Sequence, residues 1–280
     1  MTKVKRITKE QFKKKFHLQE LDPFSQGIFT KEDLQKIQED FGIIGVSKKL
    51  TTIPELIKIA RQEALRIATN IPKLFFVHLS GLIQYYVSKA KPTKDSYPFS
   101  DYVLKASIVA MVSPRRLLEI GTARGWGIAV FKSVLPECDC YTMSPKNTSG
   151  ANNELPTKEI GWAFESKGLK VTQIWSDSTK FDYDSFPPVD VTYIDGNHRY
   201  QFVYSDLINA DKITKKMIIL DDYIPSPSSP RGHVLNWGWW NADVVAATNN
   251  FLKKYPKIIK EAYWIENTPI CVLLKKTYVK

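Results

Sequence analysis

Short apolar runs alternate with amphipathic stretches from about residue 100 to the end of the chain. The runs predict strands at 116–120, 138–143, 169–175, 189–195, 216–222, 261–267 and 270–276. Helical patterns lie between them, at 126–135, 159–168, 200–211 and 242–254. Strands that alternate with helices favour parallel pairing, with helices on both faces of the sheet. The last two strands are joined by the short turn Thr268-Pro269, so we expect them to form an antiparallel hairpin.

These elements predict a doubly wound, Rossmann-like α/β fold whose mostly parallel seven-stranded sheet ends in an antiparallel hairpin. The first hundred residues have the pattern of helices instead. Thr30 is a candidate N-cap for a helix that ends at Gly42, and the apolar positions between Ile53 and Ala68 keep to one helical face. We therefore expect two parts, a helical N-terminal region over 1–96 and an α/β domain over 97–280.

The most apolar stretch of the chain covers residues 74–87. A bilayer span needs about 20 apolar residues. This run is shorter, and His78, Gly81 and Gln84 interrupt it. We expect a buried packing helix there and no membrane span.

The composition is that of a folded domain in a reducing compartment. Apolar residues make up 43% of the 280 residues, which is enough to build a core and excludes global disorder. Three cysteines do not supply a disulfide framework, and the spacing Cys138-Asp-Cys140 is not that of a zinc site. No signal-peptide pattern begins the chain, so we expect a cytoplasmic protein.

The net charge of +11 is concentrated near the N-terminus. Residues 1–100 hold 18 Lys and Arg against 10 Asp and Glu, and seven of these basic residues are among the first fifteen: Lys3, Lys5, Arg6, Lys9, Lys13, Lys14 and Lys15. Such a cluster attracts nucleic acid or an anionic surface. We favour a solvated face, because no aromatic residues interleave to stack on bases. Nucleic acid is thus the less favoured partner, and a homo-oligomer formed through the N-terminal helices is left open.

A glycine-rich turn follows the strand at 116–120, at the edge of the sheet where open α/β folds bind ligands. The stretch 119–127 reads EIGTARGWG. Glycine lets the backbone turn sharply and approach a ligand, and the helix that follows offers free N–H groups. The spacing G-x-x-x-G-x-G differs from the dinucleotide fingerprint G-x-G-x-x-G, which disfavours a nicotinamide enzyme.

Two neighbouring strands end in carboxylates. Asp195 ends one strand, and Asp221 and Asp222 end the next. At the same sheet edge, the three carboxylates repel one another, and a divalent cation relieves that repulsion. Hard oxygen ligands favour Mg²⁺, Mn²⁺ or Ca²⁺ over zinc. We therefore expect a metal site; the alternative is that one aspartate caps the next helix and the others are solvated.

Three motifs, EIGTARGWG, DGNHRY and ILDDY, together resemble the class I S-adenosylmethionine-dependent methyltransferases. The closest likeness is to the metal-dependent branch that methylates hydroxyl groups of small molecules such as macrolide sugars, which includes cephalosporin-hydroxylation-type proteins. The resemblance covers roughly residues 97–280. It implies transfer of a methyl group from S-adenosylmethionine to a small-molecule hydroxyl, assisted by Mg²⁺ or another divalent cation.

The resemblance also implies roles for the residues that match the family's motifs. The cofactor-binding positions are Glu119, Gly121, Thr122, Gly125, Gly127, Ser144, Asp177 and Asp195. The metal-binding positions are Asp195, Asp221 and Asp222, and His198 matches a general base. The competing interpretation of His198 is a helix-start residue without a catalytic role.

One position departs from the family. Ser144 stands where these enzymes usually have an acid that holds both ribose hydroxyls, and one serine does not grip both. Either another group such as Asn147 substitutes for the acid, or the protein is a catalytically silent, methyltransferase-like binding module. An RNA methyltransferase that uses the basic N-terminal region is a further alternative. The stretch 223–241, rich in proline and aromatic residues, forms either a lid or an apolar plug, and His233 within it has no assigned role.

Overall fold

The computed structural model describes residues 2–23, 27–30, 32, 33, 36, 99–146, 156–223, 225, 238–266 and 268–277. Most of the expected N-terminal helices, including residues 53–68 and 74–87 with His78, lie outside these residues. Asn147, His233 and most of 223–241 also lie outside them. The boundary between residues 96 and 97 therefore stays a prediction.

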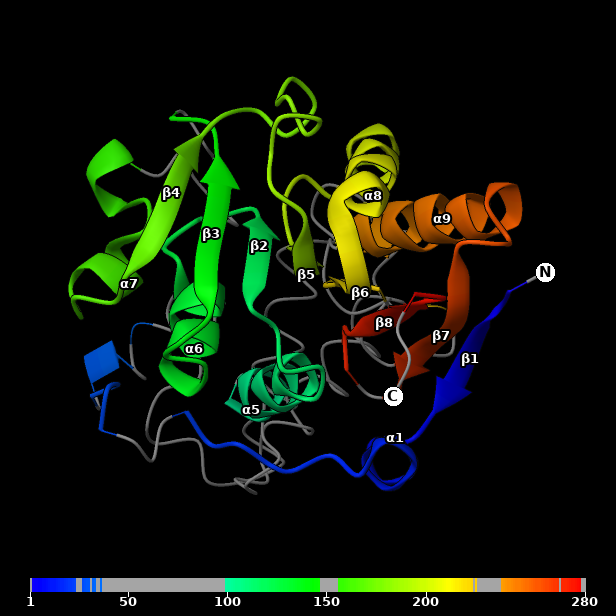
Figure 1. Ribbon diagram of the computed structural model, residues 1–280, viewed down its shortest axis with the longest axis horizontal. Helices are drawn as coiled ribbons and strands as arrows, with labels where there is room; N and C mark the ends of the chain where they lie inside the picture. The colour runs from blue at the N-terminus through cyan, green and yellow to red at the C-terminus, as the bar shows by residue number, and fades with distance from the viewer. Residues whose placement is uncertain are drawn as a thin grey trace, which may run out of the picture.

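An eight-stranded sheet forms the centre of the described structure (Figure 1). The strands are β1 (Val4–Ile7), β2 (Arg116–Ile120), β3 (Asp139–Ser144), β4 (Val171–Trp175), β5 (Val189–Ile194), β6 (Thr214–Leu220), β7 (Ile259–Ile265) and β8 (Cys271–Lys275). Their order across the sheet is β1-β7-β8-β6-β5-β2-β3-β4. β8 is antiparallel to both of its neighbours, and all other pairs are parallel. The predicted mostly parallel sheet with a terminal hairpin is confirmed.

The sheet has eight strands where seven were expected. The additional strand, β1, was not predicted from the sequence. Its residues VKRI carry two charges, and it lies at the edge of the sheet, paired in parallel with β7. Helix α1 (Lys9–Phe16) follows directly and begins with a capping box between Thr8 and Gln11. Phe12 and Phe16 of this helix pack edge-on against the ring of Tyr263 in β7. The start of the N-terminal region is therefore part of the sheet and its core.

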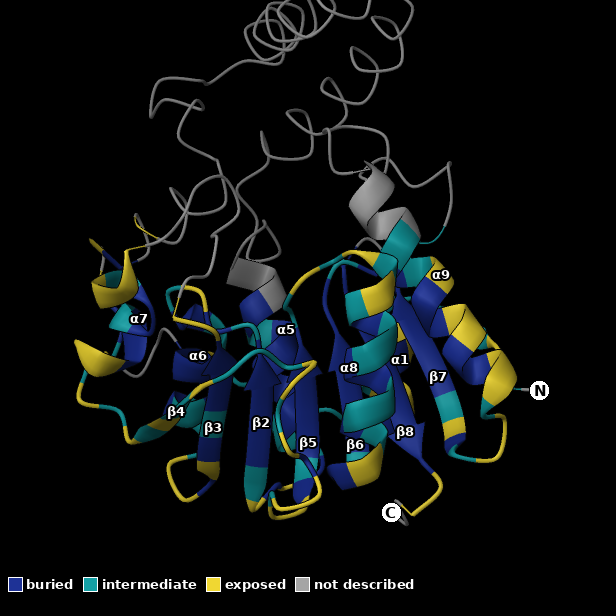
Figure 2. Ribbon diagram, turned by 90° about the horizontal axis from the view of Figure 1, so that it is seen from above, coloured by how far each residue is buried: buried dark blue, intermediate teal, exposed yellow. Residues whose placement is uncertain are grey.

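Helices cover both faces of the sheet. One face is covered by α1, α5 (Phe99–Ala110), α6 (Trp126–Val134) and α7 (Trp162–Glu165), and a 3₁₀ turn at Thr157–Glu159 precedes α7. The other face is covered by α8 (Tyr200–Ile213) and α9 (Gly238–Lys254). Alternate strand residues therefore belong to two apolar clusters, with Leu117 in one and Leu118 in the other. Figure 2 shows the central strands buried between the helices. None of the helices within the described ranges is long and apolar enough to cross a membrane.

The N-terminal segment extends across the sheet from one edge to the other (Figure 1). Beyond β1 and α1, the Leu21 N–H donates to Ser107 Oγ of α5 at 2.9 Å. Phe29 then packs on Trp126 at the start of α6. Lys167, which follows α7, pairs with Asp33 at 2.6 Å. The segment thus holds the helices of this face against the sheet.

Helix α8 carries a buried carboxylate, Asp206, on its inner side. Asp206 is 1% exposed, and its Oδ1 has no hydrogen-bond partner within the part of the chain that the structure describes. Burial, together with the charge of Asp177, raises the pKa of Asp206 to about 7, although a hydrogen bond with Ser178 opposes the rise. Ionisation of this side chain therefore destabilises the folded protein as the pH increases from about 4 to about 7.

We expect Asp206→Asn to stabilise the protein more at pH 8 than at pH 5, by roughly 2–3 kcal/mol, because the amide carries no charge to bury. Urea denaturation of both proteins at the two pH values measures the difference. Asp184→Asn, at an exposed position, is the control and leaves the free energy of unfolding unchanged. A pH-independent effect of Asp206→Asn would contradict the assignment.

Candidate functional site

The glycine turn lies at the carboxyl end of β2, in contact with the end of β5. Gly121 has φ +105°, and a Cβ there would lie 2.1 Å from the carbonyl oxygen of Asp195. Only glycine fits this conformation and this close approach. Gly125, with φ +77°, is the N-cap of α6 and has no side chain with which to cap that helix. The Glu119 carboxyl accepts from one N–H of its first turn, that of Ile128. The turn thus presents a helix N-terminus at the edge of the sheet where the strands end.

Glu119, at the end of β2, supports the glycine turn from inside the protein. It is 1% exposed and accepts a hydrogen bond from Thr142 Oγ1 at 2.5 Å. A Cβ at Gly127 would lie 2.4 Å from Glu119 Oε1, so the glycine leaves room for this carboxyl group. Burial raises the pKa of Glu119 to about 8, against the hydrogen bonds from Thr142 and the Ile128 N–H. The role of Glu119 in binding the cofactor stays a prediction.

A chain of hydrogen bonds joins the ends of β2, β3 and β4. The hydroxyl groups of Thr122 and Thr142 lie 2.8 Å apart. Gln173 Nε2 donates to Thr122 Oγ1 at 3.1 Å and lies 3.4 Å from Ser144 Oγ. Gln173 Oε1 is buried and has no hydrogen-bond partner among the described residues. Gln173, the side chain that connects Ser144 to the turn, was not predicted from the sequence.

Asp177 lies just beyond β4, beside the end of β3. The N–H of the preceding residue, Ser176, donates to the carbonyl of Ser144 at 3.1 Å. The Asp177 carboxylate accepts from the N–H and the hydroxyl of Thr179, at 2.9 and 2.7 Å. The structure therefore places the predicted cofactor-binding residues along one edge of the sheet, on the ends of adjacent strands.

A second cluster lies at the ends of β5 and β6. His198 Nε2 is 3.5 Å from Asp195 Oδ1 and 3.3 Å from Asp222 Oδ2. One ligand atom from each of the three side chains lies within 4.8 Å of the others, a spacing that a metal ion can bridge. The side chains are partly exposed, 35% for Asp195, 25% for His198 and 20% for Asp222, whereas the Nε2 atom of His198 is itself buried.

Asp221 and Asp222 are consecutive but contact different groups. Asp222 has a left-handed backbone with φ +54°, and its carboxylate faces His198. Asp221 instead contacts Lys105 Nζ through Oδ2, and the Tyr193 hydroxyl lies 2.6 Å from the same oxygen. The structure brings two of the three predicted metal ligands together with the predicted base. It places the carboxylate of Asp221 against Lys105, so its role as a ligand stays a prediction.

Lys105 and Tyr193 were not predicted from the sequence. The Lys105 ammonium donates to the Tyr193 hydroxyl at 3.1 Å, and this hydroxyl also lies 3.1 Å from Asp195 Oδ2. A signal for Lys105 was present, because it is the only charged residue between Tyr102 and Ala110, where the helical pattern is apolar. Tyr193 gives no such signal, since an aromatic residue in a buried strand is ordinary.

The charges in the cluster shift one another's pKa values. Burial alone would lower the pKa of His198, but Asp222 and Asp195 raise it to about 9. Burial and the neighbouring carboxylates raise the pKa of Asp222 to about 6 and raise that of Asp195. Burial acts in the same direction on Asp221, yet Lys105 holds the pKa of that carboxyl below its ordinary value. Lys105 therefore stabilises the charged form of Asp221, whereas His198 only partly offsets the cost of charging Asp195 and Asp222.

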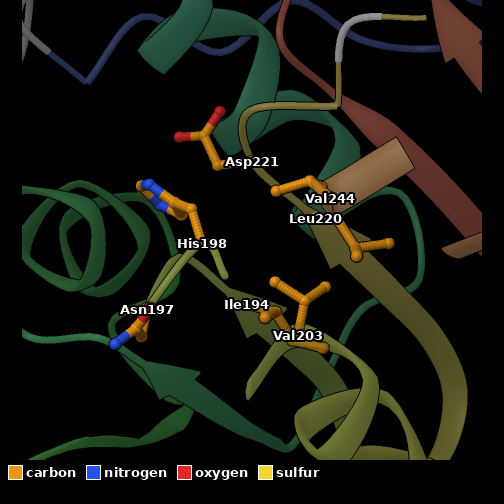
Figure 3. A pocket seen from close by; sticks show the side chains of 8 residues that line it. Ile194, Asn197, His198, Val203, Leu220, Asp221 and Val244 are labelled. Atoms are coloured by element: carbon orange, nitrogen blue, oxygen red, sulfur yellow. The ribbon is translucent and has the colours of Figure 1, made fainter. Parts of the chain in front are cut away.

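A small hollow opens beside the cluster, between the strand ends and the helices α8 and α9 (Figure 3). Its volume of about 10 Å³ has room for about one water molecule. His198 and Asp221 line one side, whereas Asn197 points away. The other side is apolar and consists of Ile194, Val203, Leu220 and Val244. The polar groups of the cluster thus border an apolar wall.

Residues 118–223 match the model of a family described as "Methyltransferase domain". The matched segment extends from β2 to just beyond β6 and includes the glycine turn, His198 and the three aspartates. This segment of the α/β part is thus similar to a methyltransferase domain, in agreement with the resemblance found in the sequence. No curated protein matches the chain.

Several solved structures are similar to the chain at low identity. An O-methyltransferase from Bacillus cereus in complex with SAH is 15% identical, covering 80% of this chain and 100% of that chain, with a TM-score of 0.44. The O-methyltransferase TomG from Streptomyces achromogenes, involved in tomaymycin synthesis and in complex with SAM, is 15% identical (83% and 94% covered; TM-score 0.46). A putative caffeoyl-CoA O-methyltransferase from Staphylococcus aureus is 13% identical (78% and 99% covered; TM-score 0.47). Similarities at this level do not extend to substrate or mechanism.

We expect Gly121→Ala to lower the melting temperature by at least about 5 °C and to weaken binding of S-adenosylhomocysteine at least tenfold. The new methyl group would collide with the backbone of Asp195, and the positive φ is unfavourable for alanine. Thermal unfolding and calorimetric titration measure both effects.

Gly196→Ala is the matched control on the facing loop. A Cβ there would lie 3.4 Å from the side chain of Ile120, which is an ordinary contact, so stability and binding stay near the wild-type values. Equal damage from both substitutions would show that the close contact at Gly121 is not what shapes the turn.

Proposed function

We propose that the protein transfers a methyl group from S-adenosylmethionine to a hydroxyl oxygen of a small molecule, assisted by a divalent cation and by His198 as the base. The observation that carries this proposal is the position of His198 Nε2, within 3.5 Å of two carboxylates at the sheet edge that also holds the glycine turn. A base, cation ligands and a cofactor turn at one edge suit methyl transfer to oxygen.

The residues at the ends of β2, β3 and β4 suit the cofactor. Its sulfonium methyl group is already activated, so the protein's main task is to align the reacting atoms. The N-terminus of α6, whose N-cap is a glycine, would bind the methionine carboxylate, as helix N-termini bind anions. Ser144, with the amide of Gln173 beside it, would contact the ribose, and Asp177 would contact the adenine. Two neutral groups would then replace the usual carboxylate.

Asp195 and Asp222 suit a hard divalent cation such as Mg²⁺. Their oxygens lie within 4.8 Å of each other and of the His198 nitrogen, and both carboxylates are partly exposed. When bound, such a cation lowers the pKa of a hydroxyl group that coordinates it. Asp221 is the third ligand proposed from the sequence, and the structure shows its carboxylate in contact with Lys105.

His198 would accept the proton that the hydroxyl group loses. The two carboxylates orient the imidazole, and they also raise its pKa to about 9, so it is protonated at neutral pH while they have no other partner. If both carboxylates held a cation, the imidazole would lose this stabilisation and the neutral form that a base requires would be favoured. The same two side chains thus position the base and govern its charge.

A small-molecule acceptor fits the observed charges better than nucleic acid does. Arg6 of the basic N-terminal cluster pairs with Glu266, Lys13 with Glu20, and Lys15 with Glu261. These ion pairs reduce the positive charge that the cluster would present to a phosphate backbone.

We expect the purified protein to bind S-adenosylhomocysteine in the micromolar range, with Mg²⁺ altering turnover more than affinity. Calorimetric titration with and without Mg²⁺ measures the binding, and a panel of hydroxylated acceptors measures turnover. No binding in either condition would refute the proposal. Binding without turnover across the panel would favour a catalytically silent module.

We expect His198→Asn to reduce turnover by about 10²–10⁴-fold while the affinity for S-adenosylhomocysteine stays within about threefold. Asparagine keeps a polar side chain but does not accept the proton at neutral pH. His17→Asn, at an exposed helix end, is the matched control and leaves both quantities unchanged. Full turnover by His198→Asn would exclude His198 as the base.

A further inference from the structure

We propose that Lys105 is a positioning residue. Its ammonium pairs with the Asp221 carboxylate, and the net charge of the cluster then suits one divalent cation. The inference rests on the proposed function, because the cation belongs to that function. Under it, Asp195, Asp222 and His198 face the cation, whereas Lys105 and Asp221 form an internal pair beside them.

Lys105 reaches the cluster from the helix layer that covers the sheet. Its side chain is 5% exposed, and that of Asp221 is 9% exposed. Its ammonium contacts Asp221 Oδ2 and donates to the Tyr193 hydroxyl, and it lies 5.3 Å from the ring centre of Tyr102. A buried ammonium without a negative partner is strongly unfavourable. Lys105 and Asp221 therefore depend on each other to remain charged inside the protein.

Both oxygens of Asp221 are engaged by groups of this chain. Oδ2 contacts Lys105 and the Tyr193 hydroxyl, and Oδ1 accepts the N–H of Asp222 at 3.0 Å. Asp195 and Asp222, in contrast, share the imidazole of His198 at the more exposed side of the cluster. The geometry separates three neighbouring carboxylates into an internal one and two that are partly exposed.

The net charge of the cluster supports the same division into one internal carboxylate, Asp221, and two outer ones. Three carboxylates contribute −3 and Lys105 contributes +1, so with a neutral imidazole the net charge is −2, which one divalent cation neutralises. Without the ammonium the net charge would be −3, and the Asp221 carboxylate would be released toward the cation. Lys105 thus limits how strongly the site attracts cations.

The test measures Mn²⁺ binding to the full chain by calorimetry or electron paramagnetic resonance, for wild type, Lys105→Met and the double variant Lys105→Met/Asp221→Asn. We expect Lys105→Met to bind Mn²⁺ at least about tenfold more tightly, because the negative charge of Asp221 is then no longer paired close to the ion. The double variant removes both charges and should return to within about threefold of wild type. Lys212→Met, which removes the same charge from an exposed position of α8, should not change binding.

The double variant decides between an internal pair and a direct ligand. If Asp221 itself binds the cation, the double variant loses a ligand and binds Mn²⁺ at least tenfold more weakly than wild type, which would overturn the inference. Unchanged binding by Lys105→Met would also overturn it. If Lys105→Met does not fold, the double variant, which buries no unpaired charge, still gives the deciding comparison.

The outcome is separable from that of the proposed function. Mn²⁺ binding by wild type with no response to Lys105→Met overturns only the role of Lys105. Absence of Mn²⁺ binding by wild type overturns both this inference and the cation in the proposed function. Methyl transfer, measured on its own, tests the remainder of that function.

Discussion

The parallel pairing of β5 with β6 is the constraint on which the site depends. Ile194 lies opposite Leu220 in this pair, so the two strands end level. The residues that follow, Asp195 and Asp221, are therefore forced to the same edge of the sheet, where their charges repel. Gly121 brings the turn after β2 against the backbone of Asp195, which places the predicted cofactor turn beside the same carboxylates. The register of β5 against β6, together with the close contact at Gly121, thus brings the glycine turn and the carboxylates together.

The protein stabilises these carboxylates with groups from opposite directions. Lys105 and Tyr193 reach Asp221 from the side of the sheet covered by α5. His198, on the loop that leads into α8, reaches Asp195 and Asp222 from the open side. Asp222 has a left-handed backbone, so the chain leaves the strand conformation at this residue. The buried and open partners give neighbouring aspartates different chemistry although they share one strand end.

Much of the fold could be predicted because its signals are local. The buried strands β2, β5 and β6 are continuous apolar runs, and a short turn forces the last two strands into a hairpin. Asp195, Asp222 and His198 could be found because they follow strand ends. The edge strand β1 could not, since it is short and half polar and its partner β7 is near the other end of the chain. Lys105 stands out in an apolar helix, but nothing local identifies Asp221 as its partner.

The pairing of β1 with β7 has a consequence for the order in which the protein assembles. Val4 lies opposite Ala262, so β1 has no neighbour in the sheet until the chain has been synthesised as far as β7. Closing so large a loop is entropically unfavourable and slow. During translation the exposed edge and the phenylalanines of α1 must stay unpartnered, which makes this interval the one most sensitive to aggregation. Docking of the N-terminal segment is then among the last steps of folding, and it completes the sheet that the nascent chain began.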